Sequence, residues 1–325
     1  MRRREFITLL GSAAAMRPRV LCAQQLGMPG IGYLYGGDSL SSSYLTAAFR
    51  KGLSETGFVE GKNVAIEFRF AENQIDRLPM LAAELVDRKV AVIVTLAGGR
   101  AILAAKAATE AIPIVFTTGG DPVEDGFVTS LNRPSGNVTG ITGMTFKIAP
   151  KRLGLLHQLL PDAANFALLV NTPTAPDNAY MIKDLQAAAV AIGRKINIVT
   201  TDGIDIDTVF ASLLRNRIDA ILVSPDLINY RAQLIATAAR HALPAIYCFR
   251  EDAEAGGLMS YGASLTDNAR LAGIYTGRIL EGEKPANLPV VQAAKFEFII
   301  NLKTARTLRL NVPTELLVFC DEVIE

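Results

Sequence analysis

Residues 107–113 read AATEAIP, and residues 238–244, 131 positions further along, read AARHALP. In each copy the alanine-rich part has the composition of a helix end, and the proline precedes an apolar run. Another apolar run comes before each helix and ends in a small hydroxyl residue, Thr95 in one copy and Ser224 in the other. The chain therefore carries one strand-helix-strand unit twice, which predicts two similar lobes.

The rest of the chain continues this alternation of short apolar runs with helical segments. The expected strands are residues 31–35, 64–70, 90–95, 114–116, 166–171, 196–200, 220–224 and 245–248. Long helical segments between strands are typical of parallel sheets that are covered on both faces. We therefore expect an α/β protein with two doubly wound parallel-sheet lobes. The lobes are expected to comprise residues 28–140 plus 264–288, and residues 144–258 plus 292–325.

Three extended segments are expected to cross between the lobes and to form a hinge. They lie near residues 139–143, 259–263 and 289–292. Two lobes joined in this way leave a cleft between them. Parallel sheets bind ligands just beyond the carboxyl ends of their strands, so the loops after the strands are the expected binding site.

The first 23 residues have the features of an export signal. Arg2, Arg3 and Arg4 precede an apolar stretch that is too short to span a bilayer, and small residues continue to Ala23. The run RREFI resembles a twin-arginine signal, and an ordinary secretory signal is the alternative. Either signal predicts a periplasmic protein. Because the residues before Cys22 do not form a lipoprotein motif, no lipid anchor is expected.

Charge and cysteine content limit the partners of the mature chain. Cleavage after residue 23 removes five arginines and one glutamate from 33 basic and 32 acidic residues, which leaves 28 and 31 and a net charge of −3. No basic patch remains, so no nucleic-acid partner is expected. Cys248 and Cys320 remain after cleavage. We expect two separate thiols, with a disulfide between them as the alternative.

Residues suited to catalysis or metal binding are few. The two histidines of the chain, His157 and His241, stand apart in expected helices, and no zinc motif accompanies them. Residues 257–262, GLMSYG, are one residue too long for a nucleophile elbow, and no histidine follows Ser260. We expect neither an enzyme nor a metal or cofactor site.

Hydroxyls and glycines dominate the expected cleft loops of the first lobe. Residues 95–99 and 117–120 combine threonine side chains with the backbone N–H groups of helix starts, a combination suited to a carboxylate. The candidate ligand contacts on this side are Tyr35, Gly36, Thr95, Gly98, Gly99, Thr117, Thr118, Gly119 and Asp121.

Carboxylates face these loops from the second lobe. Asp226 and Glu251 each follow an expected strand end, where they would suit an ammonium group. Thr172, Tyr247 and Tyr261 complete the candidate set, the tyrosines as flat walls of a small-ligand pocket.

Structural roles are the alternative for several of these residues. Asp121 and Asp226 are in positions where an acid commonly caps a helix. The tyrosines would also fit the edge of a core, and Arg250 would form an ion pair with Glu251 or with a nearby acid.

Four segments, in this order along the chain, carry a family resemblance. They are REFITLLG (4–11), IPIVFTTGGDP (112–122), LNRPSGNVTG (131–140) and GGLMSYG (256–262). Together they resemble the ABC-transporter substrate-binding family that includes tryptophan- and tyrosine-binding proteins. The resemblance covers the whole chain.

The resemblance implies a type I periplasmic binding protein fold that closes on a small-molecule solute. The implied partner is an ABC permease in the inner membrane, and the implied state is a monomer. In related amino acid binders, first-lobe hydroxyls hold the ligand carboxylate, positions matched here by Thr95, Thr117 and Thr118. A second-lobe acid holds the ammonium group, matched by Glu251 or Asp226. A periplasmic sensor that docks on a signalling protein is the alternative function.

Overall fold

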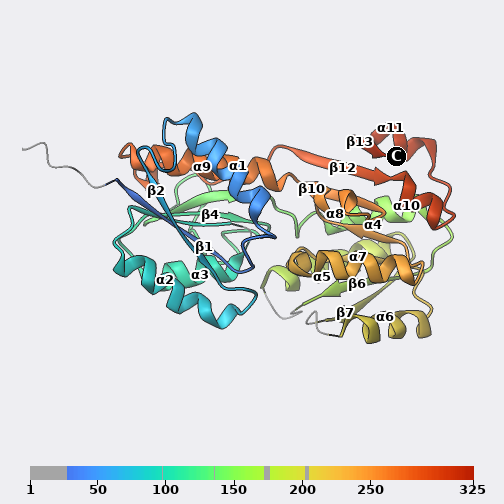
Figure 1. Cartoon of the computed structure of the whole chain (residues 1–325). Helices are drawn as coiled ribbons and strands as arrows, with labels where there is room; N and C mark the ends of the chain where they lie inside the picture. The colour runs from blue at the N-terminus through green and yellow to red at the C-terminus, as the bar shows by residue number, and fades with distance from the viewer. Residues whose placement is uncertain (1–27, 97, 135, 172–175, 202–204) are drawn as a thin grey trace, which may run out of the picture.

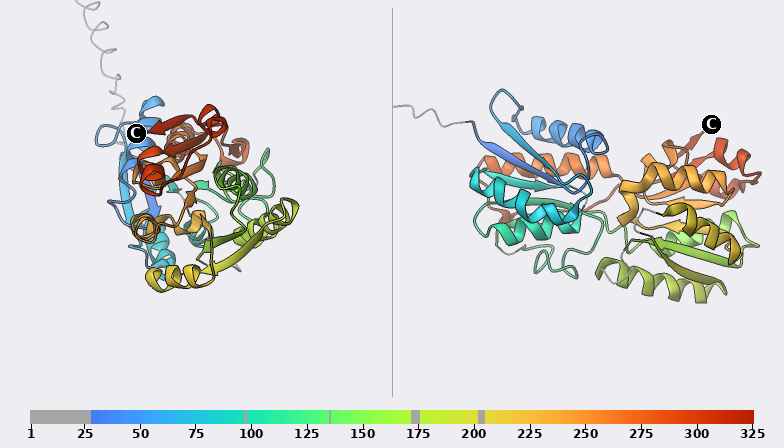
Figure 2. Two further views of the ribbon diagram at one scale, coloured as in Figure 1. Left: turned by 90° about the vertical axis from the view of Figure 1, so that its right-hand side faces the viewer. Right: turned by 60° about the horizontal axis from the view of Figure 1, so that its bottom comes forward.

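The computed structural model of the chain describes residues 28–325 apart from residues 97, 135, 172–175 and 202–204. The expected export signal at residues 1–23 and the candidate Thr172 lie outside the described residues. Two β-sheets, each with helices packed on both faces, form two lobes that lie side by side (Figures 1 and 2). The expected α/β architecture with two doubly wound lobes is confirmed.

The first sheet has six strands in the order β11-β5-β4-β3-β1-β2, all of them parallel. Its strands are β1 (Gly30–Tyr35), β2 (Ala65–Phe70), β3 (Val92–Thr95), β4 (Ile114–Thr118), β5 (Val138–Thr142) and β11 (Val291–Gln292). The helices of this lobe are α1 (Ser43–Glu55), η1 (Ile75–Arg77), α2 (Leu78–Asp87), α3 (Gly99–Ala108), α9 (Leu265–Leu280) and η3 (Pro285–Asn287).

Side-chain alternation along the strands builds one core on each face of this sheet. On one face Ile31 and Tyr33 pack with Phe49 of α1 and Ala272 of α9. On the other face Leu34 packs with side chains of α2 and α3. The strand is buried on both faces, which is why its sequence reads as a nearly continuous apolar run.

The second sheet has seven strands in the order β13-β12-β10-β9-β8-β6-β7, and only the β10–β12 pair is antiparallel. Its strands are β6 (Asn165–Val170), β7 (Lys195–Thr200), β8 (Ala220–Val223), β9 (Ala245–Tyr247), β10 (Met259–Ala263), β12 (Phe296–Asn301) and β13 (Glu322–Ile324). The helices of this lobe are α4 (Ala149–Leu159), α5 (Pro176–Ala191), α6 (Ile206–Arg215), η2 (Pro225–Tyr230), α7 (Arg231–Arg240), α8 (Arg250–Glu254), α10 (Leu302–Thr307) and α11 (Thr314–Phe319).

The repeated sequence unit takes the same form in both lobes. Strand β3, helix α3 and strand β4 build the first copy, and β8, α7 and β9 build the second. In both copies the two strands are parallel neighbours in the sheet. The helix end and proline seen twice in the sequence are therefore the same turn in each lobe.

The chain passes between the lobes three times, each time at the same end of the two sheets. It leaves β5 at Gly143, returns after β10 at Ser264, and leaves again through residues 293–295 before β12. Residues 139–142 and 259–263, expected as crossings, are paired strand residues instead, so the crossings begin where these strands end. The backbone N–H of Ser264 donates to the carbonyl oxygen of Lys295 at 3.2 Å, which joins the second crossing to the third.

The buried side chain of Arg152 connects the first crossing to strand β10. Arg152 of α4 is 1% exposed, and its Nη2 donates to the carbonyl oxygen of Thr145 at 3.0 Å. Its Nη1 donates to the carbonyl oxygen of Tyr261 in β10 at 3.4 Å. Arg152 thus connects the first crossing to β10, the strand that leads into the second crossing.

Candidate functional site

The carboxyl ends of both parallel sheets point toward the opposite lobe. The chain leaves the first sheet at the carboxyl end of β5 and leaves the second sheet at the carboxyl end of β10, and both exits lead across the cleft. The loops that follow β1, β3 and β4 therefore face the loops that follow β6, β8 and β9. This is the place where open parallel sheets bind ligands.

On the first-lobe side, Thr95 is the candidate with an unused polar atom. It ends β3, its side chain is completely buried, and its Oγ1 has no hydrogen-bond partner among the described residues. The next helix, α3, begins at Gly99, and its N-cap Gly98 supplies no side-chain cap. A hydroxyl and a row of N–H groups thus follow the same strand.

The second glycine-rich loop of the first lobe is tightly packed. Thr117 and Thr118 end β4 as buried residues, and Thr118 Oγ1 accepts from the Gly120 backbone N–H at 3.1 Å. A Cβ added to Gly119 would come within 3.3 Å of Thr145 and Phe146, which explains the absence of a side chain there.

Asp121 stabilises a turn rather than a helix. Its Oδ1 accepts from the backbone N–H groups of Val123 at 3.0 Å and Glu124 at 3.3 Å, and its Oδ2 lies 3.1 Å from Lys147 Nζ. Partial burial acts to raise its pKa, but these hydrogen bonds and Lys147 hold the pKa below its usual value. The helix expected after Pro122 is a turn of residues 122–126.

Asp226, on the second-lobe side, uses one carboxylate oxygen and leaves the other free. Its Oδ2 accepts from the Asn178 side-chain amide at 2.6 Å and from the Asn171 backbone N–H at 3.2 Å. Its Oδ1 is buried and has no partner in the described part of the chain. Ser224, not Asp226, occupies the N-cap of η2, so Asp226 is not the helix cap that was its alternative role.

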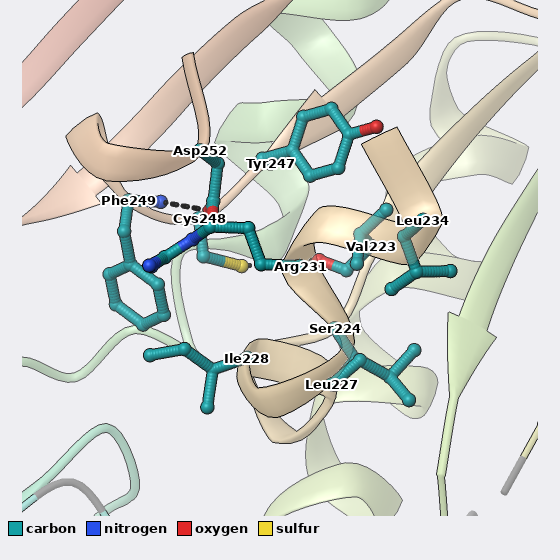
Figure 3. A pocket seen from close by; sticks show the side chains of 10 residues that line it. All are labelled: Val223, Ser224, Leu227, Ile228, Arg231, Leu234, Tyr247, Cys248, Phe249 and Asp252. Atoms are coloured by element: carbon teal, nitrogen blue, oxygen red, sulfur yellow. Dashed lines mark hydrogen bonds and ion pairs between the residues drawn. The ribbon is translucent and has the colours of Figure 1, made fainter. Parts of the chain in front are cut away.

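Arg231 is a cleft residue that the sequence did not single out. It is the first residue of α7, and its Nε donates to Oδ1 of the buried Asp252. Figure 3 shows the side chain extending from the helix to that carboxylate, beside a cavity of about 10 Å³. The guanidinium carbon lies 6.0 Å from the ring centroid of Tyr44, which belongs to α1 of the first lobe.

A weak sequence signal for Arg231 did exist. A cation in the first turn of a helix is disfavoured by the helix dipole, so an arginine at this position needs a compensating partner. The contacts of Arg231 with Tyr44 depend on how the lobes are arranged, and sequence spacing does not report that arrangement.

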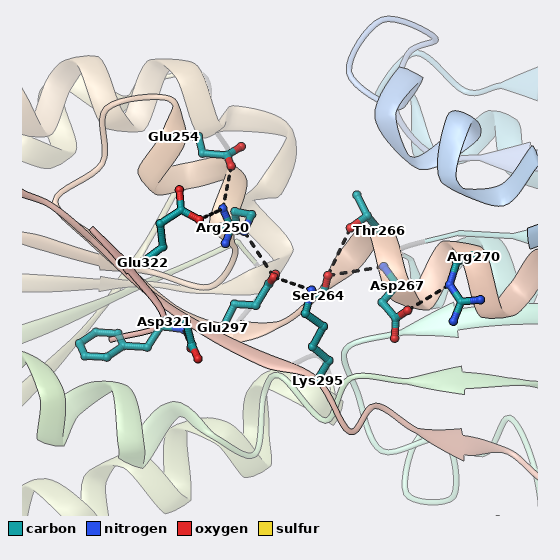
Figure 4. Close-up of polar contacts among 11 residues, drawn as sticks. Arg250, Glu254, Ser264, Thr266, Asp267, Arg270, Lys295, Glu297, Asp321 and Glu322 are labelled. Carbon is teal, nitrogen blue, oxygen red and sulfur yellow. Dashed lines mark hydrogen bonds and ion pairs between the residues drawn. The ribbon is translucent and has the colours of Figure 1, made fainter. Parts of the chain in front are cut away.

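Glu251 is a partly buried acid without an ion-pair partner among the described residues. Its Oε2 accepts no hydrogen bond from any of them, and burial raises its pKa to about 7. Of the two partners expected for Arg250, Glu251 or a nearby acid, the structure shows nearby acids: Arg250 pairs with Glu254 at 3.1 Å, Glu297 at 3.4 Å and Glu322 at 2.7 Å (Figure 4).

The three candidate tyrosines have their rings in packed surroundings. Tyr35 is 3% exposed and packs edge-on against Phe70. Tyr247 belongs to the core between the second sheet and helices α6 and α7. Tyr261 stacks on Phe296. Tyr247 and Tyr261 fit the alternative role, at the edge of a core, better than the role of cleft walls. The side chains of both point toward helices or neighbouring strands.

The remaining candidates have backbone roles. The carbonyl oxygen of Gly36 accepts from the Asn73 N–H at 2.9 Å, which closes the loop after β1.

A second contact across the cleft joins the Asp121 backbone N–H to the Tyr180 hydroxyl of α5 at 3.0 Å. Tyr180, like Tyr44, was not among the expected site residues.

Other features of the described residues limit the chemistry. No group of three His, Cys, Asp or Glu side chains among them is placed to hold a metal ion. Cys248 and Cys320 are both free thiols. Within residues 28–325, gaps excepted, no helix has both the length and the apolar character needed to cross a membrane.

Comparison with known proteins places this geometry in a family. Residues 36–324 match the family described as ABC transporter substrate binding protein. The chain belongs to this ABC transporter substrate-binding family. The family resemblance seen in the sequence is thereby confirmed.

Individual relatives of this substrate-binding protein agree with the assignment. It is 29% identical over 267 residues to a tyrosine-binding protein of Clostridioides difficile strain R20291, a match that covers 80% of this chain and 75% of the relative.

Solved structures share the fold of the substrate-binding protein. A conserved domain protein from Vibrio cholerae has a TM-score of 0.83 at 23% identity, covering 91% of this chain and 100% of that one. The ABC domain from Streptococcus pneumonia in complex with L-Trp has a TM-score of 0.81 at 23% identity, covering 92% and 100%.

Proposed function

We propose that the protein is an exported receptor that captures one small carboxylate-bearing ligand between its lobes and delivers it to an ABC permease. The ligand class we propose is an amino acid or an aromatic relative. The supporting relatives are the tyrosine-binding protein and the domain found with L-Trp. The proposed moving bodies are residues 28–140 with 264–288, and residues 144–258 with 292–325.

One observation carries this proposal: four side-chain atoms on the cleft loops are buried and have no hydrogen-bond partner within the part of the chain that the structure describes. They are Thr95 Oγ1 from the first lobe and Asp226 Oδ1, Arg231 Nη2 and Glu251 Oε2 from the second. Leaving one such atom unsatisfied costs about 1–3 kcal/mol, and more for a charged group. Hydroxyl, carboxylate and guanidinium groups that converge in this way are suited to a small polar ligand that supplies the missing partners.

The proposed ligand class can be tested with a thermal-shift screen of amino acids, organic acids and sugars on protein that has been unfolded and refolded to remove copurified ligand. A ligand at 100 times its dissociation constant stabilises the folded state by about 2.7 kcal/mol, roughly 5–10 °C for lobes of this size. A shift with sugars and none with amino acids or organic acids would show that the proposed class is wrong.

We also propose that residues 1–23 are removed on export and that the mature chain acts as a periplasmic monomer. The arginines and the short apolar stretch of the N-terminal sequence support this. N-terminal sequencing of the protein recovered from the periplasm should start near Gln24. Recovery of the full-length chain from the cytoplasm alone would contradict it.

A further inference from the structure

The guanidinium of Arg231 is held in a fixed orientation by the second lobe. Its Nε donates to Asp252, whose side chain is 7% exposed. Asp252 is fixed in turn, because its Oδ2 accepts from the Phe249 backbone N–H at 3.0 Å. A guanidinium fixed along one edge can still use its remaining N–H groups for a second, planar acceptor.

Part of that remaining edge is unused. Arg231 Nη2 is buried and meets no hydrogen-bond acceptor at bonding distance among the described residues, although the Tyr44 side chain interacts favourably with the guanidinium. Asp252 is the only acid in the described part of the chain that forms an ion pair with Arg231. The guanidinium points toward the first lobe, because its carbon atom lies 6.0 Å from the ring centroid of Tyr44 in helix α1 of that lobe. The free donor is therefore at the boundary between the lobes and not inside the second-lobe core.

The carboxylate of Glu251 is near Arg231 but does not form an ion pair with it. Glu251 precedes Asp252 in the chain and interacts electrostatically with Arg231, yet the two do not form an ion pair. Arg250 does not neutralise Glu251 either, because Arg250 is occupied by three other acids. The cleft wall thus presents one unpaired guanidinium edge and one unpaired carboxylate oxygen.

We propose that Arg231 binds the carboxylate of the ligand while Glu251 accepts its ammonium group, so that the second lobe reads both charges of an amino acid zwitterion. This inference rests on the proposed function. The proposal adds a second-lobe residue to the carboxylate site, for which the sequence predicted only hydroxyls and backbone N–H groups of the first lobe. Charge-assisted contacts from an arginine edge are about twice as strong as those from neutral donors, so Arg231 sets the requirement for a free carboxylate.

Calorimetry with paired ligands tests this assignment. The pair is L-tyrosine and L-tyrosinamide, or the amino acid that ranks first in the thermal screen and its amide. Arg231→Gln should weaken binding of the amino acid about 10- to 100-fold and change binding of the amide less than about threefold, since the amide lacks the negative charge. Arg240→Gln, at the exposed end of the same helix, is the matched control and should change neither.

A second variant separates binding from folding. Arg231→Lys keeps a cation beside Asp252 but lacks the planar donor edge, and it should give an intermediate loss for the amino acid. Equal losses for amino acid and amide, or no loss for either, would overturn the role of Arg231 while leaving the receptor function intact. A wild-type protein that binds no carboxylate ligand in the screen would instead contradict the proposed function itself, and this inference with it.

Discussion

Glu251 shows how a residue proposed to bind a ligand can lower the stability of the protein that contains it. Its carboxyl group is largely buried and lies near two other acids, Asp252 and Glu254, while a backbone hydrogen bond and the charge of Arg231 act in the opposite direction. Burial raises its pKa from the ordinary 4.5 to about 7. A neutral Glu251 is therefore the form that the ligand-free fold prefers, whereas an ammonium ligand needs the ionised form.

Glu251→Gln should make the ligand-free protein more stable at pH 8. Between pH 4.5 and 7 the carboxyl group of Glu251 holds a proton in the folded wild type that it has lost in the unfolded chain. The free energy of unfolding therefore falls as pH rises through this range, and the full loss is reached above pH 7. At about 1.4 kcal/mol per pKa unit the gain is at most about 3 kcal/mol. Urea unfolding of both proteins at pH 4 and pH 8 measures it, with near-equal stabilities expected at pH 4. A variant less stable than wild type at pH 8 would show that Glu251 has a structural partner.

Thr95→Val should likewise stabilise the ligand-free protein while weakening ligand binding. Valine has the shape of threonine, and it removes a buried Oγ1 that has no partner among the described residues, for a gain of about 1 kcal/mol. Thr139→Val is the matched control in the same sheet, because Thr139 Oγ1 donates to the Leu288 carbonyl oxygen at 2.6 Å. The control should lose about 1–2 kcal/mol by chemical denaturation. Destabilisation of both variants alike would mean that Thr95 has a hydrogen-bond partner in solution.

From the sequence, candidate site residues could be proposed only where a strand end determines their position. Thr95 ends its strand, and Asp226 and Glu251 follow theirs; the order of these strands along the chain brings the loops to one cleft. Tyr247 ends β9 and Tyr261 lies in the middle of β10, and the side to which a strand residue points depends on register, which the sequence pattern leaves open. The contacts of Arg231 depend on which helix of the opposite lobe lies in front of it.

At the level of elements, the contact between α1 and α9 is the closest helix pairing in the first lobe. A Cβ added to Gly52 would lie 1.8 Å from the carbonyl oxygen of Arg270, and one added to Gly273 would lie 2.2 Å from the carbonyl oxygen of Phe49. Glycine is required on both helices because the backbones touch. The contact covers the face of the sheet on which Tyr33 lies.

Gly273→Ala should lower the free energy of unfolding by about 1–3 kcal/mol, because the added methyl group meets backbone atoms that have no room to move. Gly154→Ala in α4 is the control, since a Cβ there meets nothing within 4 Å. It should raise stability by about 0.5–1 kcal/mol through the better helix propensity of alanine. Thermal unfolding of the two variants should move the melting temperature in opposite directions, and a shift of the same sign would contradict this packing.

Most elements were predictable because their apolar patterns are strong. All eight strands expected from the sequence are present. Six of them are buried and have nearly continuous apolar runs, whereas β2 and β7 are more exposed strands at the sheet edges in which apolar and polar residues alternate. The crossings were placed a few residues early, because extended residues such as Thr139 have the same pattern whether they pair in a sheet or not. The assignment of α9 to the first lobe depended on the expected return crossing before it and not on the composition of the helix.

For the whole molecule, the three crossings allow the lobes to rotate without breaking either core. Arg152 connects the first crossing to strand β10 of the second lobe, while the Ser264–Lys295 contact joins the second and third crossings. A ligand that touches both lobes favours closure only by the contacts it gains in the closed state. The existing contacts across the cleft, such as Asp121 with Tyr180, are the ones that closure should reinforce.

Saturating ligand should reduce the radius of gyration measured by small-angle scattering. The reduction should be absent when a sugar that does not bind is added at the same concentration. It should also be smaller for Thr95→Val, which lacks a first-lobe contact to the ligand. An unchanged radius with binding confirmed by calorimetry would indicate a rigid receptor.

The position of α9 has a consequence for the order in which the protein can be built. Arg270 pairs with Glu55, 215 positions earlier in the chain, and the apolar face of α1 stays uncovered until α9 is present. A ribosome that synthesises the chain from its amino end therefore releases the first five strands long before the helix that covers them. During that interval the half-built lobe presents an apolar surface to the cell, and chaperones that shield such surfaces should associate with nascent chains that end before residue 265.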